Sequence, residues 1–143
     1  MRAIARSAVL LCLAAGFACA DAHDDVIGVV TDMAGALIEV NVPQFMTAFS
    51  KSLPEYDTLE RNVRALVTNA DVSSSVVPVT EDAKGDTYAI DLDWLLEVRS
   101  LEQDGPIVRR REVIHCQLRK EKKRWKIVAL TPLDFFAPAN PGR

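Results

Sequence analysis

The sequence predicts an α+β domain in which three N-terminal helices precede a mostly antiparallel sheet of about four strands. Three observations lead to this prediction. Apolar residues recur every three or four positions between residues 24 and 66, which is the period of a buried helix face. Between residues 87 and 100 they alternate at every second position, as in a strand with one buried side. Helices followed by strands with hairpin-sized connections are typical of α+β proteins.

The first 20 residues have the features of a cleavable secretory signal peptide. Arg2 and Arg6 form a basic start, residues 8–17 are apolar, and residues 18–20 (Ala-Cys-Ala) form a small-residue cleavage site. The apolar run is far shorter than the roughly 20 residues that a membrane-spanning helix needs. We therefore expect no membrane span, and a mature chain that begins at Asp21 and is exported to the periplasm or secreted.

A lipoprotein anchored through Cys19 is the less favoured alternative, because Phe17 is bulky where a lipidation motif has small side chains. Removing residues 1–20 leaves 15 basic and 20 acidic residues, a net charge of −5. Only Cys116 of the three cysteines remains, so the mature chain can form no internal disulfide. Its stability must then come from its hydrophobic core.

Residues 24–40 are expected to form the first helix, with Ile27 and Ala34 beside a regular apolar stripe made of Val26, Val30, Met33, Leu37 and Val40. Pro43 can open a short second helix, because proline suits the first turn. Pro54 can open a third helix in the same way, with Asn69 as its C-terminal cap. The buried stripe of this third helix is predicted at Leu59, Val63 and Leu66.

Four strands are predicted after the helices. Residues 72–79 form an edge strand because they contain Pro78, which cannot donate to a sheet ladder. Residues 81–86 are predicted to be a turn. Residues 87–100 bury one parity of side chains, namely Tyr88, Ile90, Leu92, Trp94, Leu96 and Val98. A further hairpin covers residues 107–130, with its turn at residues 120–123 and its buried residues at Ile114, Cys116, Leu118, Trp125, Ile127 and Ala129.

Residues 108–130 hold nine basic side chains and only two acidic ones, which raises the question of nucleic-acid binding. The arginines alternate with apolar residues as one face of a strand requires, and the preceding strand offers Asp91, Asp93 and Glu97 on its polar face. A nucleic-acid site needs unneutralised cations and usually interleaved aromatic residues. We therefore predict a β-hairpin paired to an acidic strand, and no nucleic-acid partner.

Residues 24–136 resemble the nuclear transport factor 2-like superfamily. The resemblance rests on the order of the helices and strands, on the terminal hairpin, and on the segments RWKIVAL (124–130) and TPLDFF (131–136). The resemblance implies a cone-shaped fold in which the helices pack on a curved sheet and a pocket lies between them. The superfamily includes ketosteroid isomerases, scytalone dehydratase, polyketide cyclases and exported bacterial proteins. It also implies a domain at residues 21–136, followed by a disordered tail at residues 137–143, and pairing of two copies through the sheet.

Enzymes of this superfamily place ionisable groups inside the cone, so catalytic residues are expected among the side chains with inward parity. Asp91, Asp93 and His115 have the outward parity. Glu112 with Tyr56 or Tyr88 is the remaining acid–base candidate. Aromatic residues on the inward parity are candidates for an apolar ligand pocket or for the core, namely Phe45, Phe49, Tyr88, Trp94 and Trp125.

No cofactor or metal is predicted, because the adjacent His115 and Cys116 point to opposite faces of a strand and cannot hold one ion together. The expected function is therefore an exported, non-catalytic domain that binds a small apolar ligand or a partner protein. The alternative is an isomerase, cyclase or dehydratase that uses an acid–base pair in the cone.

Overall fold

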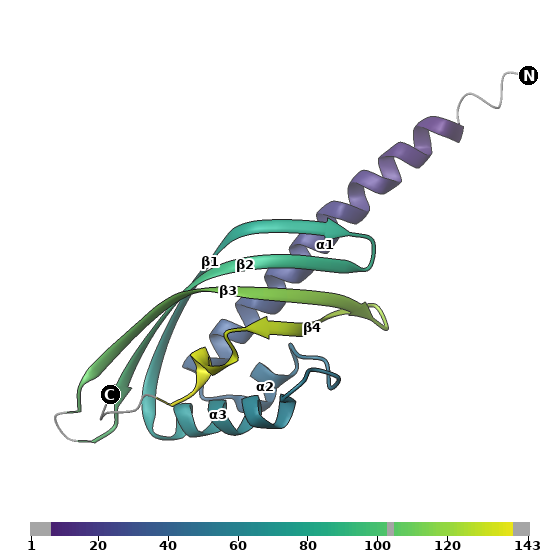
Figure 1. Ribbon diagram of the computed structural model, residues 1–143. Coiled ribbons are helices and arrows are strands. Elements are labelled where there is room, and N and C mark those ends of the chain that lie inside the picture. Colours follow the sequence, from purple (N-terminus) through teal and green to yellow (C-terminus); the bar gives the residue numbers. More distant parts are fainter. Residues whose placement is uncertain (1–6, 103–104, 139–143) are drawn as a thin grey trace, which may run out of the picture.

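The computed structural model describes residues 7–102 and 105–138, with side chains from residue 21 onward. Figure 1 shows helices packed against one curved antiparallel sheet with the strand order β1-β2-β3-β4. This confirms the predicted α+β fold, whereas the cone shape stays a prediction. The elements are α1 (Ser7–Ile38), α2 (Val42–Met46), α3 (Tyr56–Thr68), β1 (Ala70–Lys84), β2 (Thr87–Ser100), β3 (Ile107–Glu121), β4 (Arg124–Thr131) and the 3-10 helix η1 (Leu133–Phe136).

Helix α1 is longer than the predicted segment and extends past the sheet at its N-terminal end (Figure 1). The predicted cleavage site after Ala20 therefore lies within one continuous helix. Val26, Val30, Met33 and Leu37 are buried as predicted. The prediction for Val40 is wrong: the helix ends at Ile38, Val40 adopts a positive φ of 59°, and its side chain is 55% exposed.

The two shorter helices begin close to the predicted prolines. The Asn41 side chain caps α2 by accepting a hydrogen bond from the Gln44 N–H at 3.1 Å, and Pro43 occupies the first turn. Asn69 lies at the C-terminal cap of α3 and donates to the Ala65 carbonyl at 3.0 Å. The predicted buried stripe of α3 is confirmed, because the side chains with almost no exposure include Leu59, Val63 and Leu66.

Both hairpin turns are tighter than the sequence suggested. β1 continues to Lys84 and β2 begins at Thr87, so only Gly85 and Asp86 connect them, and Gly85 takes the positive φ of 56° that such two-residue turns favour. Glu81 therefore lies on a strand, and its assignment to a turn was wrong. Likewise, Lys122 and Lys123 alone connect β3 to β4.

The basic stretch is part of a β-hairpin, as predicted. Arg111 donates to both carboxylate oxygens of Asp93, from Nε at 3.1 Å and from Nη2 at 2.7 Å. Two further pairs join β3 to β2 on the same face, between Arg109 and Glu97 at 3.1 Å and between His115 and Asp91 at 2.7 Å. The acidic strand thus offsets the charge of Arg109 and Arg111 and supplies a hydrogen-bond partner for His115.

The prediction for Ala129 is wrong because a bulge changes the parity of β4. The β3–β4 register shifts between Gln117 and Leu118, where an extra residue enters β4. Trp125 and Ile127 remain buried, but beyond the bulge Leu130 takes the buried position and Ala129 is only half-buried. A bulge places one extra residue on one strand and so reverses which side chains face the core.

The segment after β4 packs into the core. Phe135 and Phe136 are 3% and 0% exposed in η1, so the aromatic pair closes the domain. The Arg110 guanidinium donates to the carbonyls of Phe135, at 2.9 Å, and Ala137. Ala137 is therefore held against β3, whereas the predicted disordered tail beyond residue 138 lies outside the described residues. Within the described part of the chain, no helix is long and apolar enough to cross a membrane.

Replacing Phe136 by alanine is expected to lower the free energy of unfolding by about 3–5 kcal/mol, because the ring is fully buried and contacts Phe45 and Trp94. Ile38→Ala, at a 53% exposed position at the end of α1, should change it by less than about 0.5 kcal/mol. Urea unfolding followed by fluorescence measures both. Equal losses in the two variants would contradict this packing.

Candidate functional site

The aromatic residues predicted to line a ligand pocket pack against one another on the concave side of the sheet. Phe136 lies 5.2 Å from Phe45 and 5.1 Å from Trp94 between ring centroids. Phe45 in turn lies 5.3 Å from Phe49. These four rings are at most 3% exposed. They fill much of the space in which the resemblance places a ligand, so their role as ligand contacts stays a prediction.

Two of the predicted acid–base residues, Glu112 and Tyr88, are not brought together. Glu112 is exposed and lies opposite Trp94, whereas Tyr88 lies opposite Leu118. The six-residue interval along β3 corresponds to about 20 Å at roughly 3.3 Å per residue. Tyr56 lies on α3, which packs against α2 and η1. Glu112 therefore cannot form the expected pair with Tyr88.

An open pocket lies where α2, residues 47–55 and α3 meet the β3–β4 hairpin. Its volume is about 560 Å³. We call it the α2/α3 pocket, and its lining residues are Val42, Pro43, Met46, Thr47, Phe49, Ser50, Lys51, Ser52, Tyr56, Glu60, Arg64, Glu121 and Lys126. Of the predicted site residues, it contains Phe49 and Tyr56.

The floor of the α2/α3 pocket is apolar and its rim is charged. Val42, Met46 and Phe49 are buried beneath it. On the rim, Arg64 pairs with Glu60 at 3.1 Å and the Lys126 ammonium donates to the Thr47 carbonyl. Lys51 forms no ion pair with any residue that the structure describes. Lys126 has no ion pair with a described residue either, but its ammonium is held by that carbonyl, whereas Lys51 forms no side-chain hydrogen bond with a described residue. The pocket thus combines an apolar surface with two cations that lack an acidic partner, of which Lys51 is the less constrained.

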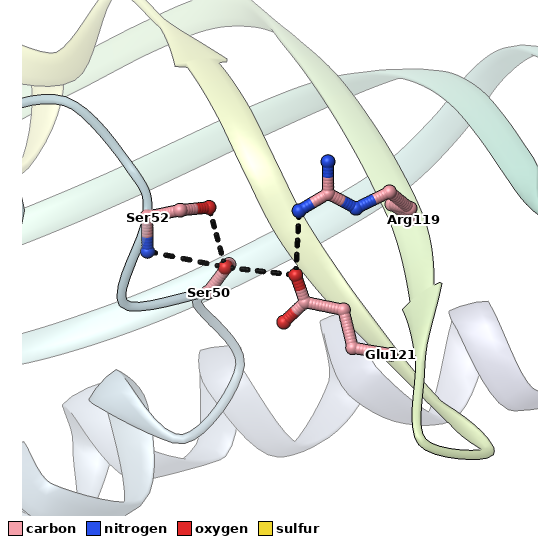
Figure 2. A network of polar contacts seen from close by, with 4 residues as sticks. All are labelled: Ser50, Ser52, Arg119 and Glu121. Carbon is pink, nitrogen blue, oxygen red and sulfur yellow. Dashed lines mark hydrogen bonds and ion pairs between the residues drawn. The ribbon is translucent and has the colours of Figure 1, made fainter.

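One side of the pocket is fixed by a polar network around Ser50, the one polar residue among the buried side chains that the structure describes (Figure 2). The Ser50 hydroxyl donates to Glu121 Oε2 at 3.0 Å and accepts from the Ser52 N–H at 3.2 Å. A hydroxyl has one proton, so Ser52 Oγ donates in the 2.8 Å contact between the two hydroxyls. Arg119 donates to the same Glu121 oxygen at 2.8 Å.

The network also sets the charge state of the pocket. Hydrogen bonds from Arg119 and Ser50 lower the pKa of Glu121 below its usual value, so this carboxylate stays ionised at neutral pH. Burial raises the pKa of Tyr56, and the charges of Glu60 and Asp57 raise it further. A general acid or base works best when its pKa lies near the operating pH. Both shifts move away from neutrality, which favours holding a ligand over transferring a proton.

Cys116 is placed in the core. Its side chain is 2% exposed, and burial raises the pKa of the thiol to about 12. A thiol reacts as the thiolate, so Cys116 is inert at neutral pH. Among the described residues, no group of three histidine, cysteine, aspartate or glutamate side chains gathers in a way that could hold a metal ion.

A second polar cluster was missed by the sequence analysis. His23 Nδ1 lies 2.9 Å from Glu81 Oε1, and the Tyr88 hydroxyl donates to the same oxygen at 2.7 Å. Burial, followed by the hydrogen bond and charge of Glu81, raises the pKa of Tyr88 to about 12. The alternating pattern of residues 87–100 had placed the Tyr88 side chain on the inward face, which could have pointed to this cluster. Its partner was hidden because Glu81 was placed in a turn instead of on β1.

Comparison with solved structures agrees with the predicted resemblance. A conserved protein from Planctomyces limnophilus superposes with a TM-score of 0.67 at 8% identity, over 77% of this chain and 93% of that one. A candidate dehydratase of the NTF2-like family from Streptomyces avermitilis gives 0.65 at 13% identity, over 75% and 91%. The chain has the nuclear transport factor 2-like fold.

A nuclear transport factor 2-like protein of unknown function from Shewanella oneidensis also superposes, with a TM-score of 0.62 at 11% identity over 76% of this chain and 95% of that one. No protein-family model matches the sequence, and no curated protein matches it significantly. At these identities the likeness concerns the fold alone, so the function has to be argued from the site.

Replacing Glu121 by glutamine is expected to lower the urea midpoint at pH 7. A carboxylate with a lowered folded-state pKa contributes stability above its unfolded pKa of about 4.5, and this contribution is lost as the pH falls through the folded-state value. The difference between Glu121→Gln and the parent should therefore shrink below pH 4.5.

Glu39→Gln is the matched control, because Glu39 is exposed at the end of α1 and forms no ion pair with a described residue. It should leave the midpoint almost unchanged at either pH. A loss in Glu121→Gln that stays constant from pH 7 down to pH 3 would show that Glu121 acts through packing instead of charge.

Proposed function

We propose that this chain is an exported, non-catalytic domain that binds a small, largely apolar molecule carrying an acidic group in the α2/α3 pocket. The observation that carries the proposal is the composition of this pocket. It has an apolar floor containing Met46 and Phe49, and Lys51 on its rim lacks an acidic partner. Burial of apolar surface supplies affinity, and a few placed polar groups orient the ligand.

The predicted apolar ligand is thereby assigned to the rim of the domain. The concave side of the sheet is occupied by Phe45, Trp94 and Phe136, whose rings are fully buried. Entry of a ligand between them would require large core side chains to move, and close-packed interiors resist such changes. The α2/α3 pocket offers its space without that rearrangement.

A second candidate function is acid–base catalysis, as in the isomerase, cyclase or dehydratase that the sequence analysis gives as the alternative to a binding domain. The cluster of His23, Glu81 and Tyr88 favours it, because a carboxylate that holds an imidazole through Nδ1 leaves Nε2 free for proton transfer. The His23 side chain is 48% exposed, so a substrate could reach it. Turnover that disappears in His23→Ala while pocket binding persists would favour this function.

The proposed pairing of two copies through the sheet draws support from its outer face. Val77 and Val113 are 58% and 44% exposed and flank Asp93 in one row across β1, β2 and β3. Arg111, which lies opposite Leu95, reaches diagonally to Asp93 and neutralises it. Apolar side chains beside satisfied charges suit a surface that a second copy covers.

The binding proposal is tested with decanoate as the probe, by isothermal titration calorimetry at pH 7. We expect binding in the micromolar range, and about tenfold weaker binding by Lys51→Gln because the ligand carboxylate loses the less constrained of the two rim cations. Decyltrimethylammonium, which has the same chain and the opposite charge, should bind much more weakly than decanoate.

Lys84→Gln is the matched control, since Lys84 lies at the far end of β1 and outside the pocket. It should bind decanoate as the parent does. Equal affinity of decanoate for the parent and for Lys51→Gln, or no binding at all, would contradict the proposed function.

Export is tested by expressing the whole chain in a bacterium with a periplasm and measuring the mass of the exported protein. We expect loss of residues 1–20 and a new N-terminus at Asp21, at a native mass of two chains. A retained Cys19 with added lipid mass would instead establish the lipoprotein. A full-length cytoplasmic product would contradict export, and a single-chain mass would contradict the pairing.

A further inference from the structure

A second open space lies between α1, the end of α2 and the β3–β4 hairpin. Its volume is about 410 Å³, and we call it the α1 cleft. It shares only Thr47 and Lys126 with the α2/α3 pocket. Its lining residues are Asp25, Val29, Asp32, Met33, Gln44, Thr47, Ala48, Lys123, Arg124, Trp125 and Lys126.

The two walls of the α1 cleft carry opposite charges. Asp25 and Asp32 are seven residues apart on α1, which places them two turns apart on one face of the helix. Lys123 and Arg124 lie on the hairpin wall. All four side chains are exposed, and none of them forms an ion pair with a residue that the structure describes. An acidic wall therefore faces a basic wall with open space between them.

Between these walls the lining includes four apolar residues, namely Val29, Met33, Ala48 and Trp125. The Trp125 side chain is 5% exposed. Its indole N–H is buried and has no hydrogen-bond partner among the described residues. Buried donors are nearly always paired, so an unpaired one calls for an explanation such as an acceptor on a ligand or a water. An indole ring also attracts an organic cation placed over its face.

The hairpin tip adds a further observation. Lys122 and Lys123 have positive φ values of 49° and 71°, although neither is glycine. A two-residue turn between antiparallel strands favours positive φ values. This tight turn places Lys123 and Arg124 next to each other at the tip of the hairpin.

We propose that the α1 cleft binds a small zwitterion. Its cationic group lies at Asp25 and Asp32, its anionic group lies at Lys123 and Arg124, and its apolar part rests on Trp125. This site is distinct from the α2/α3 pocket, although both are lined by Thr47 and Lys126, and it extends the function proposed above to a second ligand. A free amino acid or a betaine has the required chemistry.

Opposite walls discriminate against ligands that carry a single charge. A simple anion satisfies the basic wall but brings negative charge towards Asp25 and Asp32, and a simple cation does the reverse at Lys123 and Arg124. A zwitterion satisfies both walls at once. Direct closure of the cleft by ion pairs between the walls is the competing arrangement, and it would leave no room for a ligand.

The test begins with a thermal-shift panel of the twenty free amino acids and glycine betaine at millimolar concentration, on the whole mature chain. The expected result is stabilisation by at least one of them, confirmed by calorimetry. Asp32→Asn and Arg124→Gln should each weaken its binding by about tenfold or more. No stabilisation by any member of the panel would overturn the proposal.

The charge requirement is tested with three matched probes, which are L-leucine, 3-methylbutylamine and 4-methylpentanoate. The second lacks the carboxylate of leucine and the third lacks its ammonium group. If leucine is stabilising, each analogue should bind about tenfold more weakly. If a different compound of the panel stabilises the protein, the amine and the carboxylic acid that correspond to that compound take the place of these two analogues. An analogue that binds as tightly as the zwitterion would overturn the proposal.

Asp71→Asn and Arg99→Gln are the matched controls. These exposed residues lie opposite each other on β1 and β2, outside the cleft. They should bind the zwitterion as the parent does, and equal weakening in the controls would show a general charge effect and overturn the site. Decanoate binding should persist in Asp32→Asn, so failure of this proposal is distinguishable from failure of the proposed function.

Discussion

The concave side of the sheet has to be covered by apolar side chains, and Phe136 completes that cover. Its ring contacts Phe45 from α2 and Trp94 from β2, and so joins the helices, the sheet and the C-terminal segment. Arg110 holds the backbone of η1 in place through two carbonyls. Without the Phe136 ring, Trp94 and its neighbours would face solvent, and the helices would lack a common apolar surface to pack on.

Filling the interior in this way determines where ligands can bind. The two spaces considered for ligands lie at the rim, on either side of Lys126, and they differ in chemistry. The α2/α3 pocket has an apolar floor and a rigid wall made by Ser50 and Glu121, whereas the α1 cleft has two walls of opposite charge. In both, the side chains suit recognition. The lowered pKa of Glu121 and the raised pKa of Tyr56 leave neither group poised to move a proton near pH 7.

Regular alternation made much of the fold predictable. The two-residue period of β2 and β3 placed Asp91, Asp93 and Glu97 on the same face as the basic residues of β3, and the structure confirms that the two sets pair. The bulge beside Leu118 could not be predicted from the sequence, because one added residue reverses which side chains of β4 face the core without altering the composition of the strand.

Contacts between distant segments were the least predictable features. Ser50, Glu121 and Arg119 meet because residues 48–50 bridge to Ile127 at the edge of β4, and no local pattern encodes that approach. His23 meets Glu81 for the same reason, since α1 packs along β1. The resemblance placed residues 131–136 in the domain, but no local pattern showed that Phe135 and Phe136 pack into the core and close it.

The central claim is that the interior is filled and that binding occurs at the rim. Its most direct test is a ¹H–¹⁵N spectrum of the mature chain titrated with decanoate. The account predicts shifts in the amide signals of Phe49, Ser50 and Ser52, while the indole signal of Trp94, whose N–H donates to Ser74 at 2.7 Å, stays in place. A large shift of the Trp94 indole with unchanged amides at residues 49–52 would show a ligand inside the aromatic core and contradict the account.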